Sequence, residues 1–278
     1  MRAERPLDAR ATPAGSRRPG RGFKPLGEIP ASLYTTYAAA GFLGLVAVWS
    51  LLTSTRAVDP LFLPSPAEIL RRGWELFRDM GFGADVAATV LRVFLGFAAA
   101  SAVALPLGIL MGVYRPIEAL VEPLVSFARY MPASAFIPLL ILWVGVGEAE
   151  KVAVIFLGSV FSLVLMVAVH IRQAQRELVE AAYTLGASDA FVVRHVILPN
   201  AWPAIYDTLR LVLGWAWTYI IVAELVAADS GIGHVILQSQ RMLNTGNIIF
   251  GILVIGVIGL VSDLVMKAAG RALFAWRG

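Results

Sequence analysis

The chain contains no cysteine among its 278 residues. Disulfide bonds, thiolate metal ligands and cysteine nucleophiles are therefore excluded. Charged residues are scarce as well: Asp, Glu, Lys and Arg make up 15% of the sequence, against roughly a quarter in soluble domains. The three histidines, His170, His195 and His234, have no metal-ligand spacing. We therefore expect no metal site in this chain.

Nucleotide-binding and hydrolase motifs are missing too. No G-x-x-x-x-G-K-[ST] occurs, and none of the three lysines, Lys24, Lys151 and Lys267, follows a glycine. H-E-x-x-H and G-x-S-x-G are also absent, and the acidic residues are scattered. We expect neither catalysis nor cofactor binding by this chain, so any ATP-driven transport would need an ATPase on another polypeptide.

Hydrophobic residues dominate instead, at 58% of the chain with a mean hydropathy of +0.75. Six apolar segments each approach the ~20 residues needed to cross a bilayer. They cover residues 33–53, 90–113, 126–146, 153–171, 204–226 and 248–268. The sequence therefore predicts an all-α, polytopic membrane protein with about six transmembrane helices.

Three stretches qualify this pattern. Arg129 and Pro132 lie near the start of the third segment, which predicts a kinked or late-starting helix. The outer connection, residues 56–85, contains RRGWELFRDM, typical of an amphipathic segment on the membrane surface. Gly108 and Gly112 form a GxxxG pair that favours close helix packing.

Residues 1–28 are basic and lack apolar periodicity, which predicts a disordered cytoplasmic tail, or alternatively a transit peptide, before a membrane domain over 29–278. With the N-terminus inside, seven basic tail residues and nine others face the cytoplasm. The nine are Arg115, Arg129, Arg172, Arg176, Arg194, Arg210, Lys267, Arg271 and Arg277. The outside receives Arg56, Arg71, Arg72, Arg78, Lys151 and Arg241. The bias predicts cytoplasmic termini, and it explains the pI of about 9.6 without nucleic acid.

Four ionisable residues fall inside the predicted spans, where charge needs a partner or water. Arg92 and Glu224 lie at similar depths near the outer ends of their spans, and Arg210 and Asp263 near the inner ends. We expect two interhelical ion pairs, Arg92 with Glu224 and Arg210 with Asp263. The alternative is that Arg92 lines the translocation path and meets an anionic substrate.

The polar stretch 180–205, EAAYTLGASDAFVVRHVILPNAWPAI, interrupts the hydrophobic second half of the chain. Leu178, Ala181, Ala182 and Leu185 are spaced i, i+3, i+4 and i+7, which predicts a short helix with one apolar stripe. Gly186 favours a left-handed stop to that helix.

A second helix is expected to follow the glycine. Ser188 is a suitable N-cap, Asp189 suits the positive end of the helix, and Pro199 and Pro203 are expected to close it. Small residues, including Ala187, would line the bend and permit close approach of another backbone.

This stretch resembles the EAA loop of the membrane permease subunits of ABC-type importers. The matching residues are Glu180, Ala181, Ala182, Gly186, Ala187, Ser188, Leu198, Pro199, Pro203 and Ile205. The resemblance implies a cytoplasmic coupling helix, within about 176–203, that docks into an ATPase subunit. Glu180 would contribute charge at that interface, Gly186 the tight turn, and the stripe ending at Leu185 the buried contact. The alternative is an ordinary surface hairpin between spans.

Further stretches resemble the nitrate, sulfonate, taurine and bicarbonate branch of these permeases: residues 62–70, 92–112, 129–151 and 223–236. The resemblance implies a type I importer permease fold in a bacterial inner membrane. It also implies a homodimer, two ATPase subunits that use ATP and Mg, and an extracytoplasmic binding protein. Importers for glycine betaine or amino acids are an alternative, as is a secondary transporter driven by an ion gradient. A membrane scaffold or enzyme would leave 180–205 unexplained.

Overall fold

The computed structural model describes residues 29–277, and those residues form helices without any strand. The α-helices are α1 (Ala31–Ser54), α2 (Pro66–Asp79), α3 (Phe82–Val113), α4 (Arg115–Ala128), α5 (Ile137–Val144), α6 (Glu148–Arg172), α7 (Arg176–Thr184), α8 (Asp189–Val192), α9 (Leu198–Ala227), α10 (Ile232–Arg241) and α11 (Thr245–Leu273). Short 3₁₀ helices span Ala133–Phe136 (η1) and Ala275–Arg277 (η3), and a π turn, η2, spans Val193–Ile197. The predicted basic tail, 1–28, lies outside the described residues.

Among residues 29–277, five helices are long and apolar enough to cross a membrane: α1, α3, α6, the continuous stretch Asp189–Val226, and α11. Helix α4 and the segment Ala133–Val144 meet at a bend of 81°, and together they are apolar enough to form either a sixth, broken crossing or a re-entrant loop. The prediction of an all-α membrane protein with about six crossings is confirmed.

The structure differs from the predicted third segment, 126–146, in its bounds but contains the predicted kink. Helix α4 already begins at Arg115, and the break falls at residues 129–132. Pro132 explains the break, because its ring disfavours helical geometry at the preceding Met131 and it has no N–H to donate. Arg129 therefore lies at the bend rather than at the cytoplasmic end of a crossing. The excess of basic residues on the cytoplasmic side remains without it.

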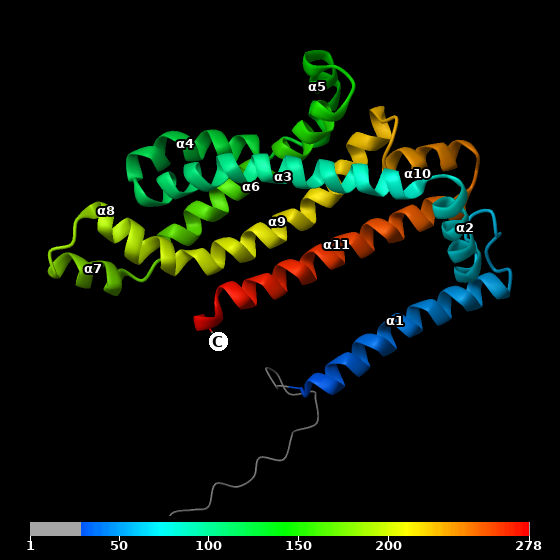
Figure 1. Ribbon diagram of the computed structural model, residues 1–278, viewed down its shortest axis with the longest axis horizontal. Coiled ribbons are helices and arrows are strands. Elements are labelled where there is room, and N and C mark those ends of the chain that lie inside the picture. Colours follow the sequence, from blue (N-terminus) through cyan, green and yellow to red (C-terminus); the bar gives the residue numbers. More distant parts are fainter. Residues whose placement is uncertain (1–28, 278) are drawn as a thin grey trace, which may run out of the picture.

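The crossings form an elongated bundle in which α3, α6 and α9 lie side by side (Figure 1). The most extensive helix pair is α3 with α6. On one side α11 packs against α9, and on the other α4 packs against α3 and α6. The amino-terminal α1 stands apart and touches the rest through α2, where Trp49 Nε1 donates to Pro64 O at 3.1 Å (Figure 1). Helices α7 and α8 lie at one end of the bundle, and α2 and α10 lie at the other.

Close contact between α3 and α6 depends on small residues at every fourth position of α3. They are Gly96, Ala100, Ala104, Gly108 and Gly112. A Cβ on Gly108 would lie 2.7 Å from Val164 O, closer than real atoms approach. The stripe extends the predicted GxxxG pair over most of the helix, so dispersion contacts and close backbone packing join the two central spans.

Helix α2 is amphipathic, as predicted. Ser65 caps it by accepting the Glu68 N–H at 3.3 Å, and Pro66 fits the first turn. One stripe, Ile69, Gly73 and Leu76, is buried against the bundle. The adjacent stripe, Leu70, Trp74 and Phe77, is exposed, which suits the membrane interface.

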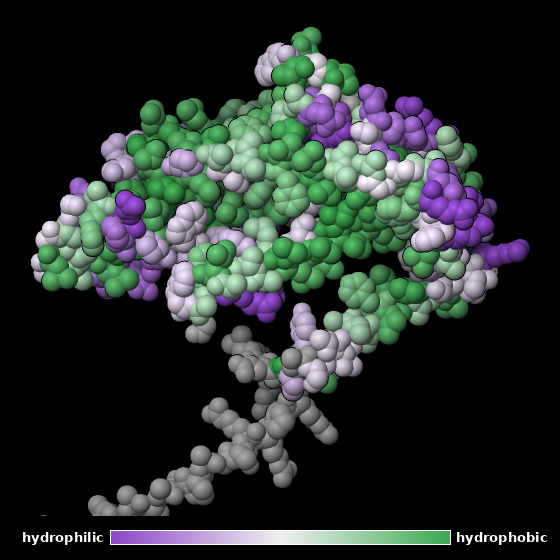
Figure 2. Space-filling view, in the orientation of Figure 1, coloured by the Kyte–Doolittle hydropathy of each residue, from purple (hydrophilic) through white to green (hydrophobic). Residues whose placement is uncertain are grey.

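The surface separates into an apolar middle and polar ends. Figure 2 shows hydrophobic side chains along the length of the bundle, with hydrophilic groups gathered toward the end that carries α2 and toward the end that carries α7. Most side chains on α1 and about half of those on α11 are exposed, and most of these are apolar. Lipid contact accounts for this exposure, so apolar surface alone does not identify a protein partner.

We predict that Gly108→Leu destabilises the protein, because the new side chain must displace the backbone of α6. Overpacking of this kind costs about 1–3 kcal/mol. Thermal unfolding in detergent measures the effect. Gly256→Leu on α11 is the matched control, since a Cβ there has nothing within 4 Å. Equal melting temperatures for the two variants would contradict the packing described for α3.

Candidate functional site

An exposed helix, α7, forms the tip of one end of the bundle (Figure 1). None of its residues is buried. In the predicted apolar stripe, Leu178 is 45% exposed, Leu185 is 88% exposed and Ala181 is also exposed. A leucine so open at a polar end of a membrane protein lacks the lipid that covers the middle of the bundle. The stripe is therefore available to a protein partner.

The turn after α7 is closed by two hydrogen bonds of a Schellman motif. The Gly186 N–H donates to Tyr183 O at 2.9 Å, and the Ala187 N–H donates to Ala182 O at 3.0 Å. Gly186 has φ +82°, the left-handed conformation that the sequence predicted. A Cβ there would meet nothing within 4 Å, so the constraint is the backbone angle rather than space within this chain.

The segment beyond the turn is fixed to α7. Ser188 Oγ accepts the Phe191 N–H at 3.4 Å, as expected for an N-cap. The Tyr183 hydroxyl donates to Asp189 Oδ1 at 3.0 Å, and this hydrogen bond raises the pKa of Tyr183. The two arms of the hairpin are thus tied by side chains as well as by backbone.

Pro199 and Pro203 do not close the second helix, contrary to the sequence prediction. Helix α8 passes through the π turn into α9, which starts at Leu198 and carries Pro203 inside it. Pro199 follows directly after the π turn, an irregular part of the helix in which regular i to i−4 hydrogen bonds are already interrupted. The helix is continuous from Asp189 to Val226, so the fifth crossing begins well before the predicted residue 204.

A cluster of charged residues surrounds Arg92 of α3 toward the opposite end; Glu224 is fully buried, whereas the Glu148 side chain is 68% exposed. The Arg92 side chain is 2% exposed, and its five N–H groups all have acceptors. Nε and Nη2 donate to the two carboxylate oxygens of Glu148, at 2.6 and 2.5 Å. Nη1 donates to Glu224 Oε1 at 2.7 Å and to Ser230 O at 2.8 Å, and Nη2 donates also to Ser230 Oγ at 2.8 Å. One guanidinium thus links α3, α6, α9 and the α9–α10 connection.

The Glu224 carboxylate is fully buried and receives further donors. Thr89 Oγ1 donates to its Oε1 at 2.8 Å, and the Gly233 N–H donates to its Oε2 at 2.8 Å. Two glycines make this approach possible. A Cβ on Gly231, whose φ is +110°, or on Gly233 would collide with Glu224 atoms. The sequence G-I-G is therefore a steric requirement of the buried carboxylate.

The predicted pair of Arg92 and Glu224 is present, and so is the second predicted pair, with Arg210 Nε 2.8 Å from Asp263 Oδ1. The second pair joins α9 to α11 and is more exposed, at 25% and 44%. Because all five donors of Arg92 are engaged, the geometry supports a structural role for it rather than contact with substrate. This arrangement favours the ion pair with Glu224 over the alternative, in which Arg92 meets an anionic substrate.

Sequence reasoning missed four members of the cluster: Asp85, Thr89, Glu148 and Ser230. A signal for the first two was available, since Asp85, Thr89 and Arg92 are spaced i, i+4 and i+7 on one helical face. Asp85 Oδ1 accepts the Gly231 N–H at 2.7 Å, and Thr89 Oγ1 accepts the Ile232 N–H at 2.9 Å. Glu148 lies in a connection by hydropathy, and only the fold brings it to Arg92.

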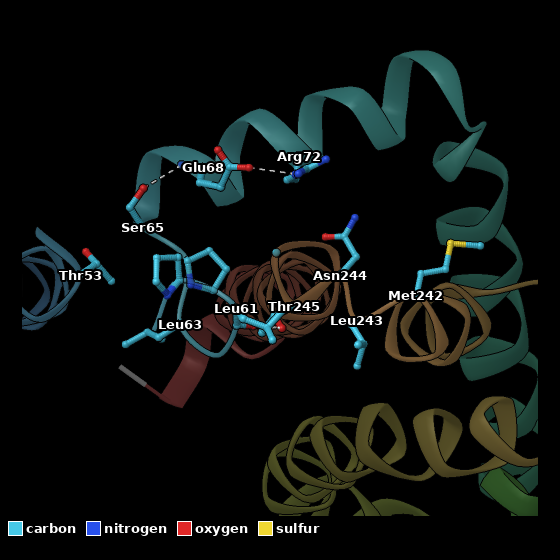
Figure 3. Close-up of a pocket in the computed structure, with 13 residues that line it drawn as sticks. Thr53, Leu61, Leu63, Ser65, Glu68, Arg72, Met242, Leu243, Asn244 and Thr245 are labelled. Atoms are coloured by element: carbon cyan, nitrogen blue, oxygen red, sulfur yellow. Dashed lines mark hydrogen bonds and ion pairs between the residues drawn. The ribbon is translucent and has the colours of Figure 1, made fainter. Parts of the chain in front are cut away.

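A cavity of about 680 Å³ opens near the end that carries α2. It lies between the α1–α2 connection, the start of α2 and the α10–α11 connection (Figure 3). Arg72 Nε pairs with Glu68 Oε1 at 2.9 Å on one wall, and Asn244 lies across from them (Figure 3). The Thr245 hydroxyl donates to Leu61 O and closes the connection. This surface is polar at its rim and faces away from α7.

These features define a class of protein: a multi-pass helical membrane transport subunit with a polar hairpin at one end and an ion-locked opposite end. The chain belongs to the binding-protein-dependent transport system inner membrane component family, whose model matches residues 104–275. It is thus the permease subunit of an ABC importer, a multi-pass protein of the inner membrane and a transport subunit rather than an enzyme. ATPase and substrate-binding partners are implied by this family.

Named relatives match nearly the whole chain. The taurine transport system permease protein TauC of Escherichia coli (strain K12) is 33% identical over 254 residues, covering 90% of this chain and 92% of TauC. The bicarbonate transport system permease protein CmpB of Synechococcus elongatus is 29% identical and covers 81% of this chain and 84% of CmpB. These relatives agree with the branch that the sequence resembles.

The fold is similar to that of a solved importer. The similarity to a chain of an inward-facing MetNI methionine ABC transporter structure covers 67% of this protein and 95% of the transporter chain. The TM-score is 0.57 and the sequence identity is 21%, so the likeness concerns the fold alone.

We predict that Arg92→Leu is strongly destabilising, because it leaves the buried Glu224 carboxylate without its cation. Loss of one partner from a buried ion pair costs about 3–5 kcal/mol. The double variant Arg92→Leu/Glu224→Leu should recover part of this loss, since it removes both charges. Arg78→Leu on α2, where the side chain is 71% exposed, is the control and should change stability by about 1 kcal/mol or less. Chemical unfolding of the purified protein measures these differences in the free energy of unfolding. If Arg92→Leu alone were as stable as the control variant, the structural role of the Arg92–Glu224 ion pair would be contradicted.

Proposed function

We propose that two copies of this chain enclose the translocation path of an ATP-driven importer. Each copy binds one cytoplasmic ATPase, which uses ATP and Mg, through α7. An extracytoplasmic binding protein delivers the solute at the end that carries α2 and α10. The observation that supports this arrangement is the exposed apolar stripe of α7 on a hairpin that is rigidly joined to a membrane-crossing helix.

The stripe fits a docking role residue by residue. Leu178, Ala181 and Leu185 supply apolar contact area, while Gly186 and Ala187 keep the bend narrow enough for a neighbouring backbone. Glu180 stands beside the stripe and is exposed, so it is free to meet a cation on the ATPase. A small interface of this kind gains most of its affinity from a few buried apolar anchors.

The mechanism follows from the continuity of the helix behind α7. The Schellman turn and the bond from Tyr183 to Asp189 fix α7 to α8, and α8 runs on through η2 into α9. At its other end α9 carries Glu224, which is locked to Arg92. When ATP binding closes the ATPases, the continuous helix from α8 to α9 transmits the movement of α7 to the outer end of the bundle. The path then alternates between outward-facing and inward-facing states.

The orientation follows from charge. Basic residues near α7 and at the inner ends of α6 and α11, including Arg172, Arg176 and Arg271, face the cytoplasm in this proposal. With six crossings, both termini then lie on the cytoplasmic side of a bacterial inner membrane. The cavity lined by Glu68, Arg72 and Asn244 faces the extracytoplasmic side, where a binding protein docks.

The substrate that we propose is a small anionic or zwitterionic solute, such as nitrate, bicarbonate, taurine or an alkanesulfonate. Support comes from the similarity to permeases named for taurine and bicarbonate. Glycine betaine or an amino acid remains the second candidate. A secondary transporter is disfavoured, because Glu224 is occupied by Arg92 and Thr89 rather than open to a coupling ion.

The proposal is tested by reconstitution. The permease, its ATPase and its binding protein are placed in proteoliposomes, and uptake of labelled taurine, bicarbonate, nitrate and methanesulfonate is measured with and without ATP. We expect uptake of at least one solute that requires both ATP and the binding protein. Uptake by the permease alone under an ion gradient would overturn the proposal. Cross-linking then counts the copies of each chain in the active complex.

We predict that Leu185→Asp weakens binding of the ATPase about tenfold or more, because a buried leucine contact is worth about 1.5–3 kcal/mol. Leu185→Met should bind normally. Leu61→Asp is the matched control, since Leu61 is an exposed leucine at the opposite end of the bundle. Titration of detergent-purified permease with the ATPase gives the dissociation constants. Equal weakening by both aspartate variants would show that the loss is not specific to α7.

We predict that Gly186→Val lowers stimulated ATP hydrolysis and uptake about fivefold or more, because a branched residue resists positive φ by roughly 1–2 kcal/mol and adds bulk at the docking face. Gly186→Asn should keep more activity, since asparagine enters this conformation more readily. The assay is ATP hydrolysis stimulated by the loaded binding protein. Full stimulation and uptake by the valine variant would contradict the role assigned to this turn.

A further inference from the structure

Arg129 sits at the break in the third crossing, where α4 ends and the chain turns by 81°. Its side chain is exposed. The guanidinium Nη2 donates to the Tyr130 hydroxyl at 2.9 Å, and its central carbon lies 4.8 Å from the centre of the Tyr130 ring. No carboxylate pairs with Arg129 among residues 29–277. Arg129 is thus a cation held by an aromatic neighbour and not by an acid.

The depth of Arg129 follows from helix geometry. Helix α4 begins at the inner end of the bundle, where Glu118 pairs with Arg172 at the end of α6. It runs for 14 residues, so Arg129 stands about 20 Å along the bundle from that end, at 1.5 Å per residue. Val125, one turn earlier, belongs to the hydrophobic cluster that runs from Ala100 to Met111 on α3 and from Val160 to Ala168 on α6. Since the hydrocarbon core is about 30 Å thick, Arg129 lies at membrane depth.

A cation at this depth needs a partner or water, because contact with lipid is costly. Arg92 meets this need with two carboxylates, whereas the recorded polar partner of Arg129 is the Tyr130 hydroxyl. Lipid is further excluded by position. The exposed apolar stripe of α4 is Leu120, Leu124 and Phe127, and at about 100° per residue Arg129 falls on the opposite face of the helix. An exposed cation on that face needs water or an anion beside it.

We propose that Arg129, positioned by Tyr130, is an anion contact within the translocation path, and that it takes the sulfonate, carboxylate or other small oxyanion group of the solute. This inference rests on the proposed function. A guanidinium presents paired donors that match such groups. The Tyr130 oxygen accepts from Arg129, so its own hydrogen is left to donate to the same anion. The break between α4 and α5 places this contact part-way across the membrane.

The chain's lack of cysteine allows a direct test in the assembled transporter. Ser134→Cys puts one thiol at the break, on an exposed position of η1. It is labelled with an anionic and a cationic methanethiosulfonate reagent, in the Arg129 and Arg129→Gln backgrounds. We expect the anionic-to-cationic rate ratio to fall about fivefold or more in Arg129→Gln. Arg129→Lys should keep it, and Arg78→Gln on α2 should leave it unchanged. An unchanged ratio in Arg129→Gln, or no labelling by either reagent, overturns the proposal.

Transport supplies the second readout. For a solute that the unaltered protein carries, with taurine and bicarbonate as probes, Arg129→Gln should lower uptake about tenfold or more. ATP hydrolysis stimulated by the binding protein should stay within about twofold, because the coupling hairpin is untouched. Normal uptake by Arg129→Gln overturns the proposed anion contact. An equal fall of stimulated ATP hydrolysis in Arg129→Gln and Arg129→Lys also overturns it, because the loss would then not depend on the charge. Absence of ATP-dependent uptake by the unaltered protein counts instead against the proposed function, and the labelling ratio still decides the role of Arg129.

Discussion

The buried guanidinium of Arg92 is the constraint on which the outer half of this protein depends. Its five hydrogen bonds bring together three membrane crossings and the connection before α10. Each acceptor is needed, because an unpaired charge at 2% exposure costs several kcal/mol. The glycines at 231 and 233 belong to the same constraint, since a side chain at either position would collide with Glu224.

The hydrogen bonds of Arg92 fix the outer end of α9 to the bundle. The hairpin of α7 and α8 is joined to the other end of the same helix. The small-residue stripe of α3 holds the central helices so close that they resist bending independently. In the mechanism that we propose, a displacement at α7 is shared by the bundle as a rigid-body movement. In an importer this property joins ATP hydrolysis on one side of the membrane to opening on the other.

Two arginines at membrane depth have different surroundings, which suit a structural role for Arg92 and a transport role for Arg129. Arg92 has every donor satisfied by its own chain and is closed to solutes. Arg129 has an aromatic clamp, an exposed side chain and a broken helix beside it. The cost of burying charge explains both arrangements, since one cation is neutralised permanently and the other is left for water and a passing anion.

The sequence by itself determined the helical membrane class, the approximate crossings, the left-handed turn at Gly186 and the two ion pairs. All follow from composition, spacing or depth, which are local or one-dimensional properties. Tertiary structure decided that Glu148 completes the Arg92 cluster, that Pro199 and Pro203 lie inside a continuous helix, and that the helix before the predicted kink begins at Arg115. Proline effects depend on whether neighbouring turns absorb a missing donor, and the partner of a buried charge depends on which distant segments meet. Both are properties of packing in three dimensions.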